Sequence, residues 1–493
     1  MHTATSPAEP LLTRLHRLRR DPGGLSPEAL GRMARECHLT DAELTDFVSF
    51  FPALTRPADT RRVCTGPACR LAGAQTDGDA SFCLGYCEQA PFTLHGEPPV
   101  AVEMDEPLDW LARFDQADAV AGLLDEIDAS GLTGMGGAAF PTGKKLAAVR
   151  DRPELQKYVI ANGDEGEPAT FKDRWLLERH PDTVLAGVLL ACRITGASRA
   201  ILYLRHEYPG ARRRMARAIQ KATVAGWIHT ETPDPHHPAV TVVEAGGPYI
   251  CGEETALIAS LEGRRGHPAP GPPYPAQSGL NKKPTLVQNV ETLFYIARIA
   301  ERGGSAWGDG KRHISISGPV ARPGVVELPR GITARQVLAA AGGITGGRAV
   351  AAFIPGGGAS GLLPPAALDV PLTNADLAEW GTGAGTGGVV FLPEGACVVD
   401  MAAHLATFYA REACGQCDPC RRGTAFQAAQ LTALTRGAPL DVNALSATAG
   451  AMRLLSICGL GRWAPVVVET LLRHFPDAVA SHAAGTCPAG VCH

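Results

Sequence analysis

The 493-residue sequence lacks two features that would place a protein in or across a membrane. No run of apolar residues reaches the roughly 18 that a bilayer-spanning helix needs. The first twenty residues contain no continuous apolar stretch of the kind that forms the core of a secretory signal. We therefore expect a cytoplasmic protein with no direct membrane insertion.

The sequence also lacks a strong imbalance of charge. Its formal net charge is −4, which gives no reason to expect nucleic acid or anionic lipid as a partner. Hydrophobic residues make up 45% of the chain and charged residues 19%, and these proportions are typical of a folded rather than a disordered protein. A chain of this length usually exceeds one hydrophobic core, so several domains are expected.

Cysteine, in contrast, is abundant, with fourteen residues. In a reducing compartment disulfides are rare, and clustered thiols more often bind metal or carry out redox chemistry. Cys37, Cys192 and Cys251 stand alone, and each is interpreted as a small buried hydrophobic residue. The close groups are Cys64 with Cys69, Cys83 with Cys87, Cys414 with Cys417 and Cys420 and the later Cys458, and Cys487 with Cys492.

The order of predicted elements indicates an α/β multidomain protein. A helix over 182–195, a strand over 200–204, a helix over about 210–224 and a strand over 240–244 alternate along the chain. This alternation favours a doubly wound sheet that binds ligands at its strand ends. Residues 398–475 have helical periodicity and no strand candidates, which predicts a small helical bundle followed by an irregular tail.

The strongest chemical signal is the sequence Cys414-Gly-Gln-Cys417-Asp-Pro-Cys420, with Cys458 following after 37 intervening residues. Three cysteines at two-residue spacing can hold one corner of a cubane cluster, and a distant fourth thiolate completes the ligand set. A zinc site is the alternative, but zinc sites usually pair two C-x-x-C hairpins. The three-plus-one spacing therefore predicts a 4Fe–4S cluster.

A second signal is the glycine-rich stretch 131–145, which ends in two lysines. Glycines let the backbone approach a phosphate or a flat ring closely, and a lysine can neutralise phosphate charge. Residues 162–168 contain three carboxylates in a turn, residues 246–255 form a glycine turn that opens a helix, and residues 284–292 are rich in amides. Helix capping or turn chemistry explains any one of these segments alone, but the four together favour a ligand site.

These segments, in this order, resemble the NADH-binding flavoprotein subunit of respiratory complex I. The same module occurs in NAD-dependent formate dehydrogenases and in soluble NAD-linked hydrogenases. The resemblance covers about residues 118–475. It implies an FMN- and NADH-binding α/β domain at 118–308, a β-grasp (SLBB-like) domain at 312–395, a helical 4Fe–4S-binding bundle at 396–475 and a cysteine-containing tail at 476–493.

The resemblance also assigns cofactor-binding residues by position. Phe140, Glu167 and Tyr274 match positions that embrace NADH. Four family positions differ, because this chain has Met135 for arginine, Gln288 for asparagine, Ala148 for phenylalanine and Gly271 for a basic residue. The positions that match the FMN site are Gly134, Gly136, Gly137, Lys145, Asn162, Asp164, Glu253, Glu254 and Asn289, and the predicted set also includes Glu165, Tyr249, Gly252 and Thr292.

Residues 1–115 resemble the thioredoxin-like 2Fe–2S subunit that partners this flavoprotein, here fused to it. Only 13 residues separate Cys69 from Cys83, which is too few for the helix and strand of the complete fold. The sequence therefore predicts a shortened thioredoxin-like module. The resemblance implies that its four cysteines, Cys64, Cys69, Cys83 and Cys87, hold a 2Fe–2S cluster.

The tail offers a further set of metal ligands. Cys487 and Cys492 are close in sequence, His482 lies upstream, and Cys397 is unassigned in the first turn of the bundle. Together these four residues make a plausible tetrahedral zinc site. The alternative is a frayed terminus with free thiols.

The expected function is an NADH dehydrogenase (diaphorase) subunit. FMN carries the hydride chemistry, so no catalytic acid–base pair is expected in the protein. The expected partner is the catalytic subunit of a formate dehydrogenase or, second, of a hydrogenase, with other iron–sulfur subunits. Two other functions stay open: a non-catalytic electron relay with impaired NADH binding, and a zinc-binding structural protein.

Overall fold

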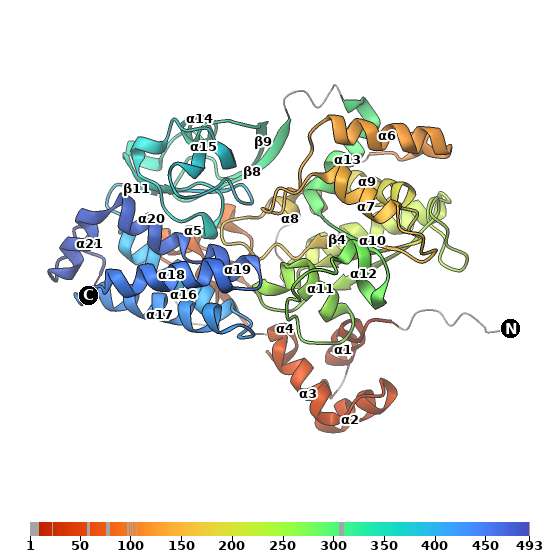
Figure 1. Cartoon of the computed structure of the whole chain (residues 1–493), viewed down its shortest axis with the longest axis horizontal. Helices are drawn as coiled ribbons and strands as arrows, with labels where there is room; N and C mark the ends of the chain where they lie inside the picture. The colour runs from red at the N-terminus through yellow and green to blue at the C-terminus, as the bar shows by residue number, and fades with distance from the viewer. Residues whose placement is uncertain are drawn as a thin grey trace.

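The computed structural model describes residues 9–492, except residues 22, 57–59, 75–78, 96, 97, 99, 101, 105 and 305–309. In these described residues, three β-sheets and a C-terminal bundle of helices follow one another along the chain (Figure 1). This is the α/β multidomain architecture that the sequence predicts. In the part of the chain that the structure describes, no helix has both the length and the apolar character needed to cross a membrane.

A fully parallel four-stranded sheet forms the centre of residues 118–308. Its order is β6-β5-β4-β7, so the chain adds β5 and β6 on one side of β4 and then returns to place β7 on the other side. The predicted strands at 200–204 and 240–244 and the predicted helix at 182–195 are confirmed, each beginning one residue earlier than expected. The strands are β4 (Tyr158–Gly163), β5 (Arg199–Leu204), β6 (Ala239–Glu244) and β7 (Thr285–Asn289), and the surrounding helices are α6 (Ala117–Ala129), α7 (Thr142–Arg150), α8 (Lys172–Arg179), α9 (Pro181–Thr195), α10 (Pro209–Val224), α11 (Glu254–Leu261), α12 (Pro275–Ser278) and α13 (Val290–Arg302).

Helix α9 lies in the core of this region. All 15 of its residues are buried, as expected for a helix that is apolar on most of its circumference. At Gly187 a Cβ atom would lie 1.9 Å from the carbonyl oxygen of Leu293 on α13. Glycine is therefore required there, because any larger residue would separate the two helices.

A second, mixed sheet follows in residues 311–393. Its order is β10-β11-β8-β9, with β11 parallel to β8 and the outer pairs antiparallel. Every residue of β11 is buried, as expected for a central strand. The elements are β8 (Lys311–Ser317), β9 (Gly324–Pro329), α14 (Ala334–Ala340), β10 (Val350–Ile354), α15 (Asn374–Ala378) and β11 (Gly388–Pro393).

Helices alone make up residues 398–475, so the predicted bundle without strands is confirmed. The tail does not begin as the expected irregular segment. Residues 476–483 form a helix instead, because Pro476 at its first position fixes a helical φ and needs no hydrogen-bond acceptor. The helices are α16 (Val398–Glu412), α17 (Asp418–Leu434), α18 (Val442–Leu455), α19 (Gly459–Trp463), α20 (Val466–His474) and α21 (Pro476–Ala483).

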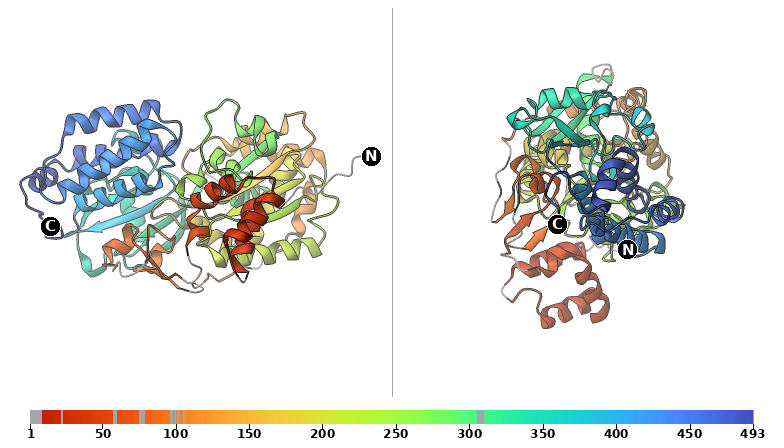
Figure 2. Two further views of the ribbon diagram at one scale, coloured as in Figure 1. Left: turned by 90° about the horizontal axis from the view of Figure 1, so that it is seen from below. Right: turned by 90° about the vertical axis from the view of Figure 1, so that its left-hand side faces the viewer.

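The N-terminal region consists of four helices and a small three-stranded sheet. In the right-hand view of Figure 2 the N-terminal helices project from the rest of the molecule. The central strand β1 pairs in parallel with β2 and antiparallel with β3, which is a reduced version of a thioredoxin-like sheet. The elements are α1 (Leu11–Arg20), α2 (Pro27–Glu36), α3 (Asp41–Phe50), α4 (Pro52–Thr55), β1 (Arg62–Cys64), α5 (Pro67–Leu71), β2 (Asp79–Ser81) and β3 (Thr93–Leu94).

Candidate functional site

The large parallel sheet changes direction between β4 and β7, and ligands bind α/β sheets at the carboxyl ends of strands at such a point. Asn162 near the end of β4 and Asn289 at the end of β7 are register partners. The Asn162 side chain donates to the Gly252 carbonyl at 2.8 Å, and the Asn289 side chain donates to the Asp173 carboxylate at 2.6 Å. Both predicted amides are therefore fixed at this edge.

The glycine-rich loop is held against the same edge. The Met135 amide donates to Thr292 Oγ1 at 2.9 Å, which ties the loop to the first turn of α13. A Cβ atom on Gly136 would lie 3.5 Å from Asn289 Cβ, so the loop backbone comes close to the strand end. Gly137 has a φ of +107°, a conformation that residues with a side chain rarely adopt. The fold therefore creates the close backbone approach that a flavin or phosphate needs.

The N-terminus of α11 brings a cation to this edge. Lys145 donates to Glu254 at 2.7 Å, and both side chains are partly exposed. Glu253 accepts hydrogen bonds from the backbone amides of Thr255 and Ala256, both at 2.9 Å. Glu253 is thus the N-cap of α11, so helix capping does account for this one residue. A lysine beside a helix N-terminus provides the positive potential that favours a phosphate group.

Two polar atoms at the strand ends have no hydrogen-bond partner, although they are buried. They are Oδ2 of Asp164, an acceptor when ionised, and Nε2 of Gln288, a donor. Buried polar groups are normally paired, so an unpaired donor and an unpaired acceptor at one edge indicate a missing ligand. FMN carries both kinds of group and fits this requirement. Burial also raises the pKa of Asp164 to about 7.

The other two predicted carboxylates already have protein partners. Glu165 accepts from the backbone amides of Asp173 and Arg174 at 2.9 and 3.1 Å, at the start of α8. Glu167 accepts from the Ala359 amide at 2.8 Å, from the Tyr409 hydroxyl at 3.0 Å and from the Tyr249 hydroxyl. Glu167 therefore joins the large sheet region, the second sheet region and the bundle.

Two aromatic side chains stay available on the surface of this region. Phe140 is 55% exposed and Tyr274 is 58% exposed, which is unusual for side chains of this size. Phe140 precedes α7 and Tyr274 precedes α12, and these two helices contact each other. A Cβ atom on Gly271 would lie 2.5 Å from the Tyr274 ring, so this ring occupies the space that a basic side chain at 271 would need.

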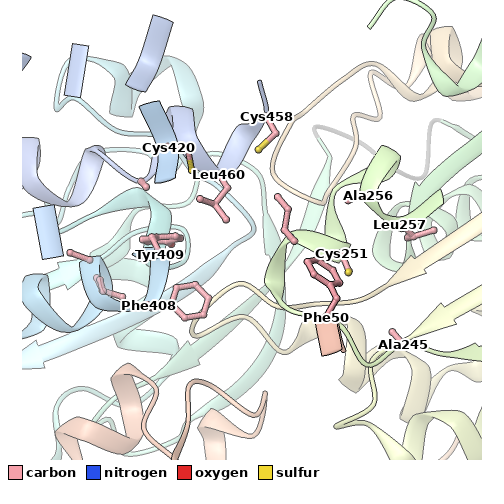
Figure 3. Packing of buried hydrophobic residues seen from close by; sticks show 14 of the residues in the cluster. Phe50, Ala245, Cys251, Ala256, Leu257, Phe408, Tyr409, Cys420, Cys458 and Leu460 are labelled. Atoms are coloured by element: carbon pink, nitrogen blue, oxygen red, sulfur yellow. The ribbon is translucent and has the colours of Figure 1, made fainter. Parts of the chain in front are cut away.

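The cysteines of the three-plus-one motif line one pocket. The space between Cys414, Cys417, Cys420 and Cys458 is also bordered by Ile250, and about 230 Å³ is not filled by protein atoms. Figure 3 shows Cys420 and Cys458 near Leu460 in this part of the bundle. Cys417 and Cys458 directly precede α17 and α19, whose N-termini favour negative charge at the sulfur atoms. Burial raises the pKa of Cys420 to about 12, so cluster binding must release its proton.

A single turn of 3₁₀-helix, η3 (Tyr249–Gly252), joins the flavin edge to this pocket. Its last residue, Gly252, accepts the hydrogen bond from Asn162. Ile250 lines the cysteine pocket. The Tyr249 amide donates to Glu412 at 2.7 Å, two residues before Cys414. Glu412 was not among the predicted site residues, although an acid this close to a ligand cysteine is a signal in the sequence.

The N-terminal cysteines also come together. All four are buried, Cys83 Sγ lies 3.4 Å from Cys87 Sγ, and the Leu84 amide donates to Cys64 Sγ at 3.4 Å. The Ala169 amide donates to Cys83 Sγ at 3.4 Å, so the quartet lies against the loop that contains Asp164 and Glu167.

The tail residues form the most compact ligand group. The ligand atoms of Cys397, His482, Cys487 and Cys492 all lie within 4.8 Å of one another, a spacing that neither of the other two cysteine quartets reaches in the described residues. Cys397 Sγ is 3.3 Å from His482 Nε2 and 3.6 Å from Cys492 Sγ. His482 Nδ1 donates to the Ala478 carbonyl at 2.7 Å, which leaves Nε2 with a free lone pair for a metal. This geometry suits one tetrahedral ion, whereas wider spacing suits a multi-iron cluster.

Known protein families match the same segments. The model of the Nuo51 FMN-binding domain matches residues 127–298, that of the SLBB domain residues 314–361, and that of the NADH-ubiquinone oxidoreductase-F iron–sulfur binding region residues 400–482. An F-type NADH-quinone oxidoreductase subunit of Rhizobium meliloti, numbered 2, is 36% identical over 73% of this chain and 88% of its own length. The chain belongs to the family of NADH-quinone oxidoreductase F subunits. It is therefore an oxidoreductase with an FMN-binding domain and a 4Fe–4S-binding region.

Other similar proteins agree with this assignment. The F-type NADH-quinone oxidoreductase subunit of Aquifex aeolicus is 39% identical over 72% of this chain and 84% of its own length. The NADP-reducing hydrogenase subunit HndC of Solidesulfovibrio fructosivorans is 35% identical, over 76% and 78% of the two chains. A solved NAD⁺-reducing [NiFe]-hydrogenase in the H₂-reduced state is similar with a TM-score of 0.83 and 29% identity, over 96% of this chain and 92% of that chain.

The raised pKa of Asp164 leads to a pH-dependent stability in the flavin-free protein. Because the folded pKa, about 7, exceeds the ordinary value of 3.8, the folded state holds a proton that the unfolded state loses. The resulting stabilisation is complete below about pH 4 and is lost as the pH rises through 7. We expect chemical denaturation midpoints of the flavin-free wild type to fall between pH 5 and 7.5, and Asp164→Asn to flatten this dependence. Equal slopes for both proteins would show that Asp164 titrates normally.

Proposed function

We propose that this chain is a diaphorase subunit that moves electrons between NAD(H), FMN and iron–sulfur clusters. The observation that carries the proposal is the position of η3, which contacts the flavin edge through Gly252 and the cysteine pocket through Ile250. Bound FMN supplies the two-electron chemistry with nicotinamide and the one-electron chemistry with clusters. The task of the protein is then to hold both cofactors on the two sides of η3 and to exclude water between them.

In this proposal each segment of the edge binds a different part of the flavin nucleotide. Lys145 and the N-terminus of α11 hold the phosphate, and Asn162 and Asn289 orient polar groups at the strand ends. Asp164, with its unpaired Oδ2, accepts a hydrogen bond from the ligand. The further residues of the proposed FMN site are Gly134, Gly136, Gly137, Glu165, Tyr249, Gly252, Glu253, Glu254 and Thr292.

The nicotinamide cofactor is proposed to bind beside the exposed aromatic rings. Phe140 and Tyr274 present flat apolar surfaces that suit stacking. Glu167 completes the proposed site, although its oxygens already accept three hydrogen bonds. It therefore acts on the ligand by holding Tyr249 in place, or it exchanges one of these donors when the nicotinamide binds.

NADH binding tests this proposal against the alternative of a non-catalytic relay. Loss of a stacking partner costs about 1–3 kcal/mol, so Phe140→Ala should raise the Michaelis constant for NADH by roughly 5- to 150-fold with unchanged FMN content. Leu155→Ala is the matched control, because Leu155 is 97% exposed and lies outside the site. The readout is anaerobic NADH reduction of flavin and cluster, followed by absorbance. If NADH bleaches neither centre in the wild type, the chain is a relay without nicotinamide chemistry.

The N-terminal quartet is proposed to hold a 2Fe–2S cluster. Its thiols are buried, paired at 3.4 Å and clustered against the Asp164 loop, which would bring a second redox centre next to the flavin edge. The similar hydrogenase structure covers 96% of this chain, so the N-terminal region also has a counterpart there.

The tail quartet is proposed to bind one zinc ion, held by Cys397, His482, Cys487 and Cys492. Three thiolates and one histidine form a common structural zinc set. His482→Ala should remove about one zinc per chain, measured by elemental analysis, with iron and FMN content unchanged. His474→Ala is the control, since His474 lies on the preceding helix outside the ligand group. Equal zinc content in both variants would assign the metal elsewhere.

We propose a cytoplasmic complex as the setting of this chain. Its partner would be the catalytic subunit of a hydrogenase or of a formate dehydrogenase, together with other iron–sulfur subunits. The hydrogenase subunits among the similar proteins support the first choice. Copurification of the chain with its partners from the native source tests this assignment.

A further inference from the structure

The tail site and the N-terminal cysteine module are connected through one ion pair. Asp400, in the first turn of α16, donates its backbone amide to Cys397 Sγ at 3.4 Å. Its carboxylate accepts two hydrogen bonds from Arg70, from Nε at 2.7 Å and from Nη2 at 2.5 Å. Arg70 directly follows Cys69 on α5. A ligand of the tail site is therefore two contacts away from a cysteine of the N-terminal quartet.

Two further contacts lie on the same face of α16. His404 Nε2 donates to the carbonyl of Thr65, the residue after Cys64. The Phe82 ring, next to Cys83, stacks on His404 and packs against Phe408, with centroid distances of 4.4 Å in both cases. Positions 400, 404 and 408 are four residues apart and so form one stripe along the helix. The N-terminal module docks along this stripe, and the tail site lies at its N-terminal end.

Charge provides a physical link between the two sites. A divalent ion bound by three thiolates and a neutral histidine leaves the tail site with a net charge of −1, which a nearby cation stabilises. Hydrogen bonding to Asp400 raises the pKa of Arg70, and the negative potential of the Cys492 and Cys397 thiolates acts in the same direction. An Arg–Asp pair with exposures of 42% and 24% contributes little to stability unless its geometry is fixed. A metal bound to Cys397 fixes that geometry, because it immobilises the turn that carries Asp400.

We propose that the tail metal ion fastens the N-terminal cysteine module to α16 through Cys397, Asp400 and Arg70. This inference rests on the proposed tail site. The ion then has a defined role in the molecule, because it stabilises the contact between two redox modules rather than only the terminus. Loss of the ion frees the first turn of α16, and the Arg70 contact then becomes an ordinary surface ion pair.

Hydrogen exchange of the full-length protein, followed by mass spectrometry, tests the proposal. His482→Ala and Cys487→Ser, which lose the metal, should speed exchange in peptides covering 62–71 and 79–94 by roughly tenfold, while α9 stays protected. Arg70→Ala should speed exchange in the same peptides but keep the zinc. Arg335→Ala is the matched control, because Arg335 forms a similar two-point pair with Asp369 in the second sheet region. It should leave these peptides unchanged.

Elemental and flavin analysis of the same samples separates the possible failures. Zinc lost with unchanged exchange at 62–71 and 79–94 would overturn the fastening role while leaving the zinc site intact. A wild type without bound metal would overturn both the tail site and the fastening. Returning zinc to chelator-treated wild type should restore slow exchange, and persistent fast exchange would also contradict the proposal. Normal FMN and NADH reduction in any of these samples shows that the diaphorase function is independent of the outcome.

Discussion

Cys458→Ser should yield a protein that takes electrons from NADH but cannot pass them beyond the flavin. Cys458 closes the ligand set from the N-terminus of α19, and Ile250 of η3 lines the same pocket. Serine is a poor ligand for iron, so the cluster should be lost while the flavin edge, on the other side of η3, stays intact. Four irons per chain and the EPR signal of the reduced cluster should disappear. Reduction of acceptors that depend on the cluster should fall by at least about 100-fold.

The comparison variant is Cys37→Ser, which changes a thiol that only accepts a hydrogen bond from Arg14. It should keep wild-type iron content and rates. Direct flavin reduction by NADH, measured by stopped flow, should stay within about twofold of wild type in both variants. If Cys458→Ser keeps its iron, the proposed ligand set is wrong. If it loses FMN as well, the two cofactor sites are not independent.

The second large effect is expected from Gly137→Val. At a φ of +107° a β-branched residue costs roughly 1–3 kcal/mol of backbone strain, and the loop can relieve it only by moving from the sheet edge. A Cβ atom there would also contact Thr386 at 3.6 Å. Since the loop forms one wall of the flavin site, FMN affinity should fall by roughly 10- to 100-fold, and the protein should be purified largely without flavin.

Gly131→Ala is a matched control for this variant in the same loop. Its φ of +65° lies in the left-handed region, and no atom lies within 4 Å of an added Cβ. The substitution should lower stability by about 1 kcal/mol and leave FMN affinity unchanged. Affinity is measured by reconstitution of flavin-free protein with FMN and fluorescence quenching. Equal affinities for the two variants would place the flavin away from this loop.

The sequence predicted the strand–helix alternation and the cysteine groups well, because both depend on local spacing. The change of direction between β4 and β7 could not be predicted in the same way. It depends on which side of β4 the last strand joins, and only the fold shows that Asn162 and Asn289 are neighbours. The joining of Cys397 to the tail cysteines was predicted from chemistry alone, and the structure brings these ligand atoms together.

The roles of single carboxylates were harder to predict. Glu165, Glu167 and Glu253 all lie in segments that the sequence marked as ligand sites. Glu253 turned out to cap α11, and Glu165 accepts hydrogen bonds from the first amides of α8. The partners of Glu167 lie 192 and 242 positions further along the chain. No local pattern reveals partners at that separation, so sequence reasoning identified the segments but not the bonds.

The contacts of Glu167 restrict how this chain can be recombined with others. Its carboxylate takes one hydrogen bond each from η3, from the Ala359 loop and from Tyr409 of α16. A chimera that takes the second sheet or the bundle from another protein keeps this buried carboxylate but loses one of its donors. An unpaired buried acceptor of this kind costs about 1–3 kcal/mol. Chimeras are therefore expected to fold well only when the residues at 249, 359 and 409 come from the same parent.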